Sequence, residues 1–308
     1  MHFWLLIEGE PLPIDFDSSR LHRMCSIAEV LHSRGHKVTL WSSTTNHRDK
    51  KLRSNNQLVT KYLPKYDVIL LDSPTYKRNI SIARIRHNIN TADQFKKIAL
   101  NGMVDLPDLI ITAYPAIEFA RAGVEIANKL GIPSVVDVRD LWPDSIAAVG
   151  SMNKSSKPFK ILKKIEHHLY LSASKIVVVT DSFKKYIIKE HQIKPEKIGV
   201  FKNGVLISNF KKPKPNDVLT LKESLGLKNK IIISYLGTHG LAHGLKFILE
   251  SISKISNSDL HFLFIGDGAE KQNLIKFSKT LHSKNFTFLE SVTKSEIPLY
   301  LEISDYSL

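Results

Sequence analysis

The chain has 308 residues, 43% of them hydrophobic and 24% charged, which is typical of globular proteins and long enough for two domains. The single cysteine, Cys25, excludes a disulfide framework and a cysteine-based metal site, and no apolar run approaches the roughly 18 residues of a membrane span. The formal net charge of +14 indicates an anionic partner: nucleic acid, anionic lipid or a phosphorylated substrate.

The first two-thirds of the chain alternates short apolar runs with stretches of helical periodicity. Phe3–Ile7 and Lys37–Trp41 are apolar runs, and a helical pattern that ends at Gly35 lies between them. Because such runs are continuously apolar and rich in β-branched residues, we expect a parallel sheet with helices on both faces. The expected strands are 3–7, 37–41, 68–71, 109–112, 134–138 and 175–180, and the expected helices are 18–33, 79–100, 116–130, 157–171 and 182–190.

A second α/β series follows a segment with the composition of a linker. Lys211–Asp217 holds two prolines and three lysines and no apolar residue, which is typical of a linker. Expected strands then lie at 231–236, 261–265 and 286–289, with helices at 245–255 and 269–281. We therefore expect two doubly wound Rossmann-like domains facing a cleft, 1–208 and 209–308, the second one short.

The segment Ser234–Gly244 reads Ser-Tyr-Leu-Gly-Thr-His-Gly-Leu-Ala-His-Gly. A strand, a glycine-rich turn and a helix start make an anion site, since glycines let the backbone approach a phosphate and the helix N-terminus offers unpaired N–H groups. The alternative is a plain strand–helix turn without a ligand. The same two interpretations apply to Gly266-Asp267-Gly268 and to Asn203-Gly204.

Charged residues follow the expected strand at 134–138. Arg139 and Asp140 are well placed there for substrate binding or acid–base work, because ligands bind beyond the carboxyl ends of parallel strands. The alternative is that Asp140 caps the next helix.

Two basic amphipathic segments, 76–87 and 157–165, suit either an anionic membrane surface or an ordinary solvated helix face. The thirteen histidines show no paired metal spacing, so no protein-bound metal is expected. No module that combines aromatic and basic residues is found, so nucleic acid is not an expected partner.

Five segments, taken in order, resemble one known family. They are Arg34–Thr39, Asp137–Asp144, Asn203–Val205, Tyr235–Gly240 and Phe264–Gly268. Together they are similar to the family 4 glycosyltransferases of the GT-B fold, particularly the branch that builds bacterial capsule and O-antigen polysaccharides. The resemblance implies a retaining transferase with an acceptor-binding N-terminal domain, a nucleotide-sugar domain after it, and no metal or other cofactor. It also implies a donor that is usually UDP-linked, a lipid-linked glycan acceptor, and a cytoplasmic enzyme attached peripherally to the inner face of the plasma membrane.

The resemblance also assigns residues to roles. The catalytic candidates are Asp140 and Arg139. The first-loop and acceptor candidates are Glu8, Gly9, Arg20 and Arg23. The donor-binding candidates are Asn203, Gly237, Thr238, His239, Gly240, Gly244, Gly266, Asp267 and Gly268.

The sequence departs from the family in four places. His239 and His243 stand where many relatives carry Arg and Lys, and the first loop lacks the usual Gly-Gly pair. Tyr114-Pro115 stands where a histidine is common. The chain also ends near where the family's Glu-x7-Glu segment begins, so we expect a truncated, catalytically poor chain with exposed apolar edges at Ile303 and Leu308. The alternative function is a non-catalytic remnant that only binds.

Overall fold

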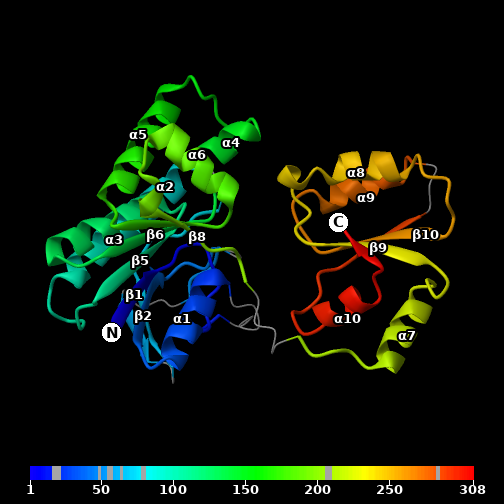
Figure 1. Ribbon diagram of the computed structural model, residues 1–308, viewed down its shortest axis with the longest axis horizontal. Helices are drawn as coiled ribbons and strands as arrows, with labels where there is room; N and C mark the ends of the chain where they lie inside the picture. The colour runs from blue at the N-terminus through cyan, green and yellow to red at the C-terminus, as the bar shows by residue number, and fades with distance from the viewer. Residues whose placement is uncertain are drawn as a thin grey trace. The chain divides into compact units, whose positions relative to one another are not determined.

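The computed structural model describes residues 1–15, 22–47, 50–53, 58–62, 65–77, 81–204, 210–281 and 285–308. The chain forms two compact units, Met1–Gly204 (unit 1) and Val205–Leu308 (unit 2), each with its own sheet (Figure 1).

Unit 1 is built on an eight-stranded sheet in the order β3-β4-β2-β1-β5-β6-β7-β8, in which only β3 is antiparallel to its neighbour. The order reverses between β1 and β5, and such a switch point opens a crevice at the carboxyl edge of a sheet. The strands are β1 (His2–Leu6), β2 (Lys37–Ser43), β3 (Leu58–Tyr62), β4 (Asp67–Leu71), β5 (Leu109–Tyr114), β6 (Ser134–Val138), β7 (Lys175–Val178) and β8 (Ile198–Val200).

Helices cover both faces of this sheet, as the apolar strands predict. Alternate residues of β1 enter different cores: Leu5 packs on the α1 side with Met24, while Trp4 packs on the α2 and α3 side against Trp41 and Phe95. The helices are α1 (Arg23–Ser33), α2 (Ile82–Ala99), α3 (Ile117–Leu130), α4 (Asp144–Ala148), α5 (Lys157–Ser172) and α6 (Asp181–His191).

Unit 2 has a four-stranded parallel sheet in the order β11-β10-β9-β12. Helices α8 and α9 cover one face and α7 and α10 the other (Figure 1). The strands are β9 (Ile231–Leu236), β10 (Leu260–Ile265), β11 (Phe286–Leu289) and β12 (Tyr306–Ser307), and the helices are α7 (Pro215–Ser224), α8 (Leu245–Ile252), α9 (Lys271–Ser278) and α10 (Ile297–Glu302).

Three expectations are corrected by the structure. The segment 211–217 is not linker throughout, because α7 begins at Pro215 and proline fits the first turn of a helix. The strand expected to reach Thr180 ends at Val178, and the Thr180 hydroxyl instead caps α6 by accepting from the Phe183 amide. Ile303 is 0% exposed in the core of unit 2, so the expected apolar edge there is wrong, although Leu308 is 56% exposed.

The described helices include none with the length and apolarity that crossing a bilayer requires.

Candidate functional site

Four charged side chains meet at the carboxyl edge of the unit 1 sheet. Arg139, which follows β6, forms an ion pair with Glu10 of the loop after β1. Arg23, the first residue of α1, donates from Nε to both carboxylate oxygens of Asp137 at 3.0 and 3.1 Å. Its Nη1 donates to the Lys202 carbonyl at 3.1 Å and to Asn203 Oδ1 at 3.3 Å. The loops after β1, β6 and β8 are thus tied together.

The charged side chains of this cluster are largely buried, which limits their access to a ligand. The side chain of Asp137 is 3% exposed and that of Arg23 is 13% exposed. Burial raises the pKa of Asp137, although Arg23 opposes the shift, and burial lowers the pKa of Arg139 to about 10. Because each arginine already has a carboxylate partner, Arg23 and Arg139 hold loops in place and are not open receptors for an anion.

Asp140 is the other catalytic candidate. It is half-buried, and its Oδ2 accepts from the Ser145 hydroxyl at 3.0 Å. Helix α4 has Pro143 at its N-cap and no side-chain cap, so Asp140 does not cap that helix. The interpretation of Asp140 as the cap of the next helix is therefore wrong.

The first loop places Glu8 and Gly9 in a separate polar cluster. Glu8 Oε1 accepts from the Ser43 hydroxyl at 3.3 Å and lies 3.1 Å from His87 Nε2. His87 Nδ1 lies 2.8 Å from the Pro74 carbonyl, so each ring nitrogen of His87 faces an oxygen acceptor. Gly9 has a φ of 85°, a conformation that favours glycine. Arg20, the remaining first-loop candidate, lies outside the described residues.

In unit 2 the turns after β9 and β10 interlock through the backbone. The Gly237 amide donates to the Ile265 carbonyl at 3.0 Å, and the His239 amide donates to the Asp267 carbonyl at 2.9 Å. The Glu270 amide donates back to the His239 carbonyl at 2.9 Å. The two glycine-rich turns expected to bind the donor are therefore one joined structure.

Two of the glycines are required by this close approach. A Cβ on Gly266, whose φ is 146°, would lie 1.9 Å from the Gly237 carbonyl oxygen. A Cβ on Gly268 would lie 2.4 Å from the His239 carbonyl oxygen. These positions have glycine because the two turns touch, whereas the nearest neighbours of a Cβ on Gly240 would be side-chain atoms, His243 Nδ1 at 3.2 Å and Thr238 Cγ2 at 3.7 Å.

The donor-binding candidates divide by exposure. Thr238 and Asp267 are exposed, and Gly244 has a φ of 62° directly before α8. His239 is 0% exposed, and its ring nitrogens have no hydrogen-bond partner among the described residues. Burial, with the nearby charge of Lys271, lowers the pKa of His239. The ring is therefore a neutral packing group against Phe288, not a group presented to a ligand. Asn203 belongs to unit 1, where its amide oxygen accepts from Arg23.

Sequence reasoning missed Lys271, a buried lysine at the start of α9. Its Nζ donates to the Leu289 carbonyl at 3.0 Å and pairs with Glu290 at 2.8 Å, which ties α9 to the end of β11. A lysine three residues after the Gly266-Asp267-Gly268 turn is the only sequence signal that could have drawn attention to it.

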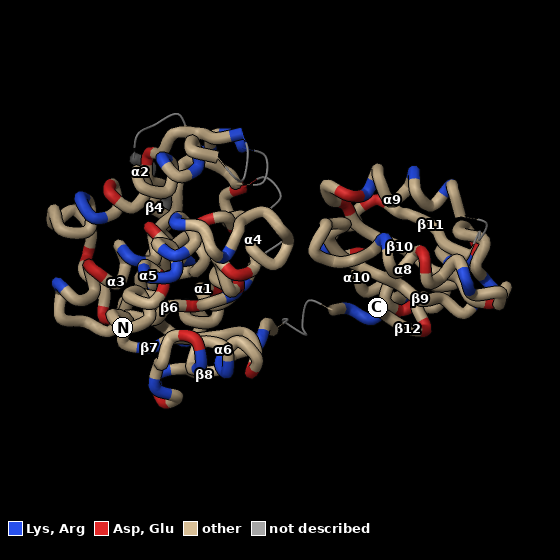
Figure 2. Tube along the Cα trace, turned by 90° about the horizontal axis from the view of Figure 1, so that it is seen from above, with Lys and Arg blue, Asp and Glu red and all other residues tan. Residues whose placement is uncertain are grey.

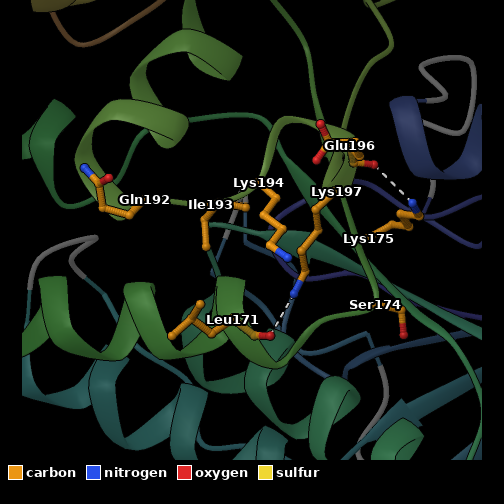
Figure 3. A pocket seen from close by; sticks show the side chains of 8 residues that line it. All are labelled: Leu171, Ser174, Lys175, Gln192, Ile193, Lys194, Glu196 and Lys197. Atoms are coloured by element: carbon orange, nitrogen blue, oxygen red, sulfur yellow. Dashed lines mark hydrogen bonds between the residues drawn. The ribbon is translucent and has the colours of Figure 1, made fainter.

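The pocket drawn in Figure 3, of about 460 Å³, lies at the opposite edge of unit 1, where β7 and β8 begin. Two of its lysines are occupied: Lys197 donates to the Leu171 carbonyl at 2.7 Å and Lys175 donates to the Glu196 carbonyl at 3.1 Å. The pocket is far from the loops that follow the strands, so it is not the candidate site. Within the described ranges, no group of three His, Cys, Asp or Glu side chains is suited to a metal ion.

Comparison with known proteins places this architecture in a family. Residues 23–208 match the model of Glycosyltransferase Family 4, and residues 217–308 match that of Glycosyl transferases group 1. The chain therefore belongs to Glycosyltransferase Family 4.

The chain has low sequence identity to individual curated relatives. The chain is 26% identical over 168 residues to the probable glycosyltransferase WbjE of Pseudomonas aeruginosa, covering 53% of this chain and 38% of WbjE. It is 26% identical over 206 residues to the putative colanic acid biosynthesis glycosyl transferase WcaI of Escherichia coli K12, covering 66% of this chain and 50% of WcaI. The chain thus spans half or less of the length of these relatives.

Solved structures show the same two-domain GT-B fold. Anabaena Alr3699/HepE, determined in complex with UDP-glucose, has a TM-score of 0.64 and 14% identity, with 100% of this chain and 73% of that chain covered. WaaG, a glycosyltransferase involved in lipopolysaccharide biosynthesis, has a TM-score of 0.65 and 12% identity, with 100% and 74% covered. The expectation of two parallel-sheet α/β domains of the GT-B class is confirmed.

Proposed function

We propose that the chain transfers a sugar from a nucleotide-sugar, most suitably UDP-linked, to a lipid-linked glycan during synthesis of a cell-surface polysaccharide. The observation that carries the proposal is the start of α8, which follows Gly244 and has no side-chain cap. Its first N–H groups and its dipole suit the diphosphate of a donor without a metal ion. A UDP-glucose complex of HepE and the colanic acid role in the name of WcaI support the substrate classes.

The proposed chemistry keeps the configuration of the sugar. The bond between the anomeric carbon and the phosphate oxygen breaks, and a bond from that carbon to the acceptor oxygen forms on the same face. The acceptor proton passes to the departing diphosphate, whose charge the first backbone N–H groups of α8 stabilise. No protein nucleophile is required. Asp140 then orients the acceptor hydroxyl, while Glu10 and the Asp137–Arg23 pair hold Arg139 and the neighbouring loops in place.

Titration with UDP tests the donor site. The native chain should bind UDP saturably in EDTA, and Gly240→Val should weaken binding at least about tenfold, since a branched side chain would displace His243 and crowd the turn. Gly240→Ala is the graded control and should fall between the two. Unchanged affinity in the valine variant would place the diphosphate elsewhere. Saturable binding without any sugar transfer would instead favour the non-catalytic alternative.

We also propose that unit 1 attaches the chain peripherally to the anionic inner face of the plasma membrane. Lys157, Lys160 and Lys164 are exposed on α5 with Ile161, and lysine positions recur along this helix (Figure 2). Lys163, which the sequence grouped with them, faces inward and binds Asp144 and Glu166. The exposed lysines are suited to phospholipid headgroups.

Vesicle flotation measures this attachment. The chain should float with vesicles of phosphatidylcholine plus phosphatidylglycerol, not with phosphatidylcholine alone, and salt should weaken recovery. Changing Lys157, Lys160 and Lys164 to Gln should weaken binding by about 3 kcal/mol, or roughly a hundredfold, at about 1 kcal/mol for each lysine. The charge-matched control changes Lys254, Lys276 and Lys279 of unit 2 and should float like the native chain. Equal recovery of the two triple variants would refute docking through α5.

A further inference from the structure

A fully buried carboxylate lies beneath the segment that carries the catalytic candidates. Glu166 of α5 is 0% exposed, and four side chains surround it. Tyr170 donates its hydroxyl proton to Oε1 at 2.9 Å, and the Tyr114 hydroxyl oxygen lies 3.4 Å from the same atom. Lys163 Nζ and His191 Nε2 lie 2.6 and 3.1 Å from Oε2. We call Glu166, Tyr114, Tyr170, Lys163 and His191 the Glu166 hub. A buried charge needs this many partners to be tolerated.

Two members of the hub reach the segment 139–144. The Tyr114 hydroxyl donates its proton to the Trp142 carbonyl, and the Tyr114 carbonyl accepts from the Arg139 amide at 3.4 Å. Lys163 donates to Asp144 Oδ2 at 2.9 Å. The segment is therefore held at Arg139, Trp142 and Asp144, and each of these hydrogen bonds is made with a residue of the Glu166 hub. Asp140 lies between Arg139 and Trp142.

Tyr114 and Glu166 are fully buried, so neither side chain is presented to a ligand. A hydroxyl that lies beside a buried carboxylate and donates to a loop carbonyl fixes the loop without touching a ligand. The packing of Leu141 and Trp142 on the core of Tyr114, Leu169 and Tyr170 adds an apolar contact to these polar ties.

We propose that the Glu166 hub, through Tyr114 and Lys163, positions the segment 139–144 and so sets the orientation of Asp140. Tyr114 and Lys163 are positioning residues that act through Trp142 and Asp144. The kinetic consequence rests on the proposed sugar transfer, whereas the structural consequence does not.

The two tyrosines provide a matched pair of variants. Tyr114→Phe and Tyr170→Phe each remove one hydroxyl from Glu166 Oε1 and keep a buried ring, but only Tyr114→Phe releases the Trp142 carbonyl. Acrylamide quenching of tryptophan fluorescence reports on the segment, because Trp4 and Trp41 are fully buried and Trp142 is half-buried. We expect greater quenching in Tyr114→Phe and native quenching in Tyr170→Phe. Equal quenching in the two variants would overturn the proposal.

Sugar transfer is the second readout. Tyr114→Phe should lower kcat about 10- to 100-fold with the KM for the donor unchanged, since small misplacements of a reacting group have effects of this size. Tyr170→Phe should keep native values. If quenching differs as expected but kcat does not, the positioning stands and the catalytic role of the segment is wrong.

A second pair of variants tests the hydrogen bond between Lys163 and Asp144. This pair also tests the proposal if Tyr114→Phe does not fold. Asp144→Asn weakens the bond to Lys163, whereas Lys154→Gln removes only the exposed partner of Asp144 at 3.2 Å. Greater quenching in Asp144→Asn alone supports the proposal, and native quenching in both variants contradicts it.

Discussion

Replacing Gly266 with alanine should unfold unit 2 at a much lower urea concentration than in the native chain. The new Cβ would lie 1.9 Å from the Gly237 carbonyl oxygen, and that neighbour is backbone, so the turns after β9 and β10 would have to separate. The φ of 146° adds strain for any residue other than glycine. We expect a loss of about 4 kcal/mol or more, a large part of the 5–15 kcal/mol typical of a folded domain. UDP binding should be lost with it.

The positions of the tryptophans allow the unfolding of unit 2 to be measured separately from that of unit 1. Trp4, Trp41 and Trp142 all lie in unit 1, so tryptophan fluorescence follows unit 1 while far-ultraviolet circular dichroism follows both units. Gly266→Ala should show an early dichroism transition and a native fluorescence transition. Gly240→Ala is the control in the same structure and should unfold close to the native chain, because the nearest neighbours of its Cβ are side-chain atoms. Coincident native transitions in Gly266→Ala would show that the close approach is not needed.

Arg23→Leu should destabilise unit 1 by about 3–5 kcal/mol, the usual effect of removing one partner from a buried ion pair. The variant leaves Asp137 buried, with Arg139 Nε at 3.9 Å as its nearest remaining cation. Lys202 and Asn203 would also lose the bonds that hold the loop after β8. The urea transition followed by tryptophan fluorescence measures the loss.

The pH dependence has a definite sign. Burial raises the pKa of Asp137 even with Arg23 present, so the folded state binds this proton more readily than the unfolded state does. Without Arg23 the pKa should rise further, and the deficit of Arg23→Leu should shrink as the pH falls and Asp137 becomes protonated. The double variant Arg23→Leu with Asp137→Leu should be more stable than Arg23→Leu alone. A double variant that is less stable would contradict the buried-charge explanation.

Apolar patterning was sufficient for most of the fold. Strands β1 (His2–Leu6) and β9 (Ile231–Leu236) are mostly apolar because both of their faces are covered, and the sequence predicted their ends to within one residue. The apolar pattern gave wrong element boundaries where one residue type is compatible with two kinds of local structure. Pro215 was interpreted as part of a linker but begins α7, and Thr180 was interpreted as strand but caps α6. The antiparallel edge strand Leu58–Tyr62 lies in a polar stretch without a strong period.

The site was less predictable because its contacts are long-range. Arg23 and Asp137 are 114 residues apart, and only the strand order that places β1 next to β5, and β5 next to β6, brings them together. Asp137 did carry a signal: a carboxylate within the apolar run Ser134–Val138 requires a partner. His239 was chosen for its place in a glycine-rich turn, and no sequence rule indicates that its ring is buried.

Many of the basic residues are structural. Arg23, Arg139, Lys163, Lys271 and Lys197 all bind carboxylates or carbonyls of the chain itself. The net charge of +14 therefore favours anionic partners in general, while the exposed lysines of α5 and the start of α8 are the described features best suited to meet them.

The most direct test is transfer itself. The chain is incubated in EDTA with UDP-sugars and membranes that hold lipid-linked glycans, and nuclear magnetic resonance determines the UDP released and the anomeric configuration of the glycolipid product. The proposed function predicts that UDP release matches product formation and that the product keeps the donor's configuration. An inverted product, or UDP-sugar that binds to the chain and is never consumed, would contradict it.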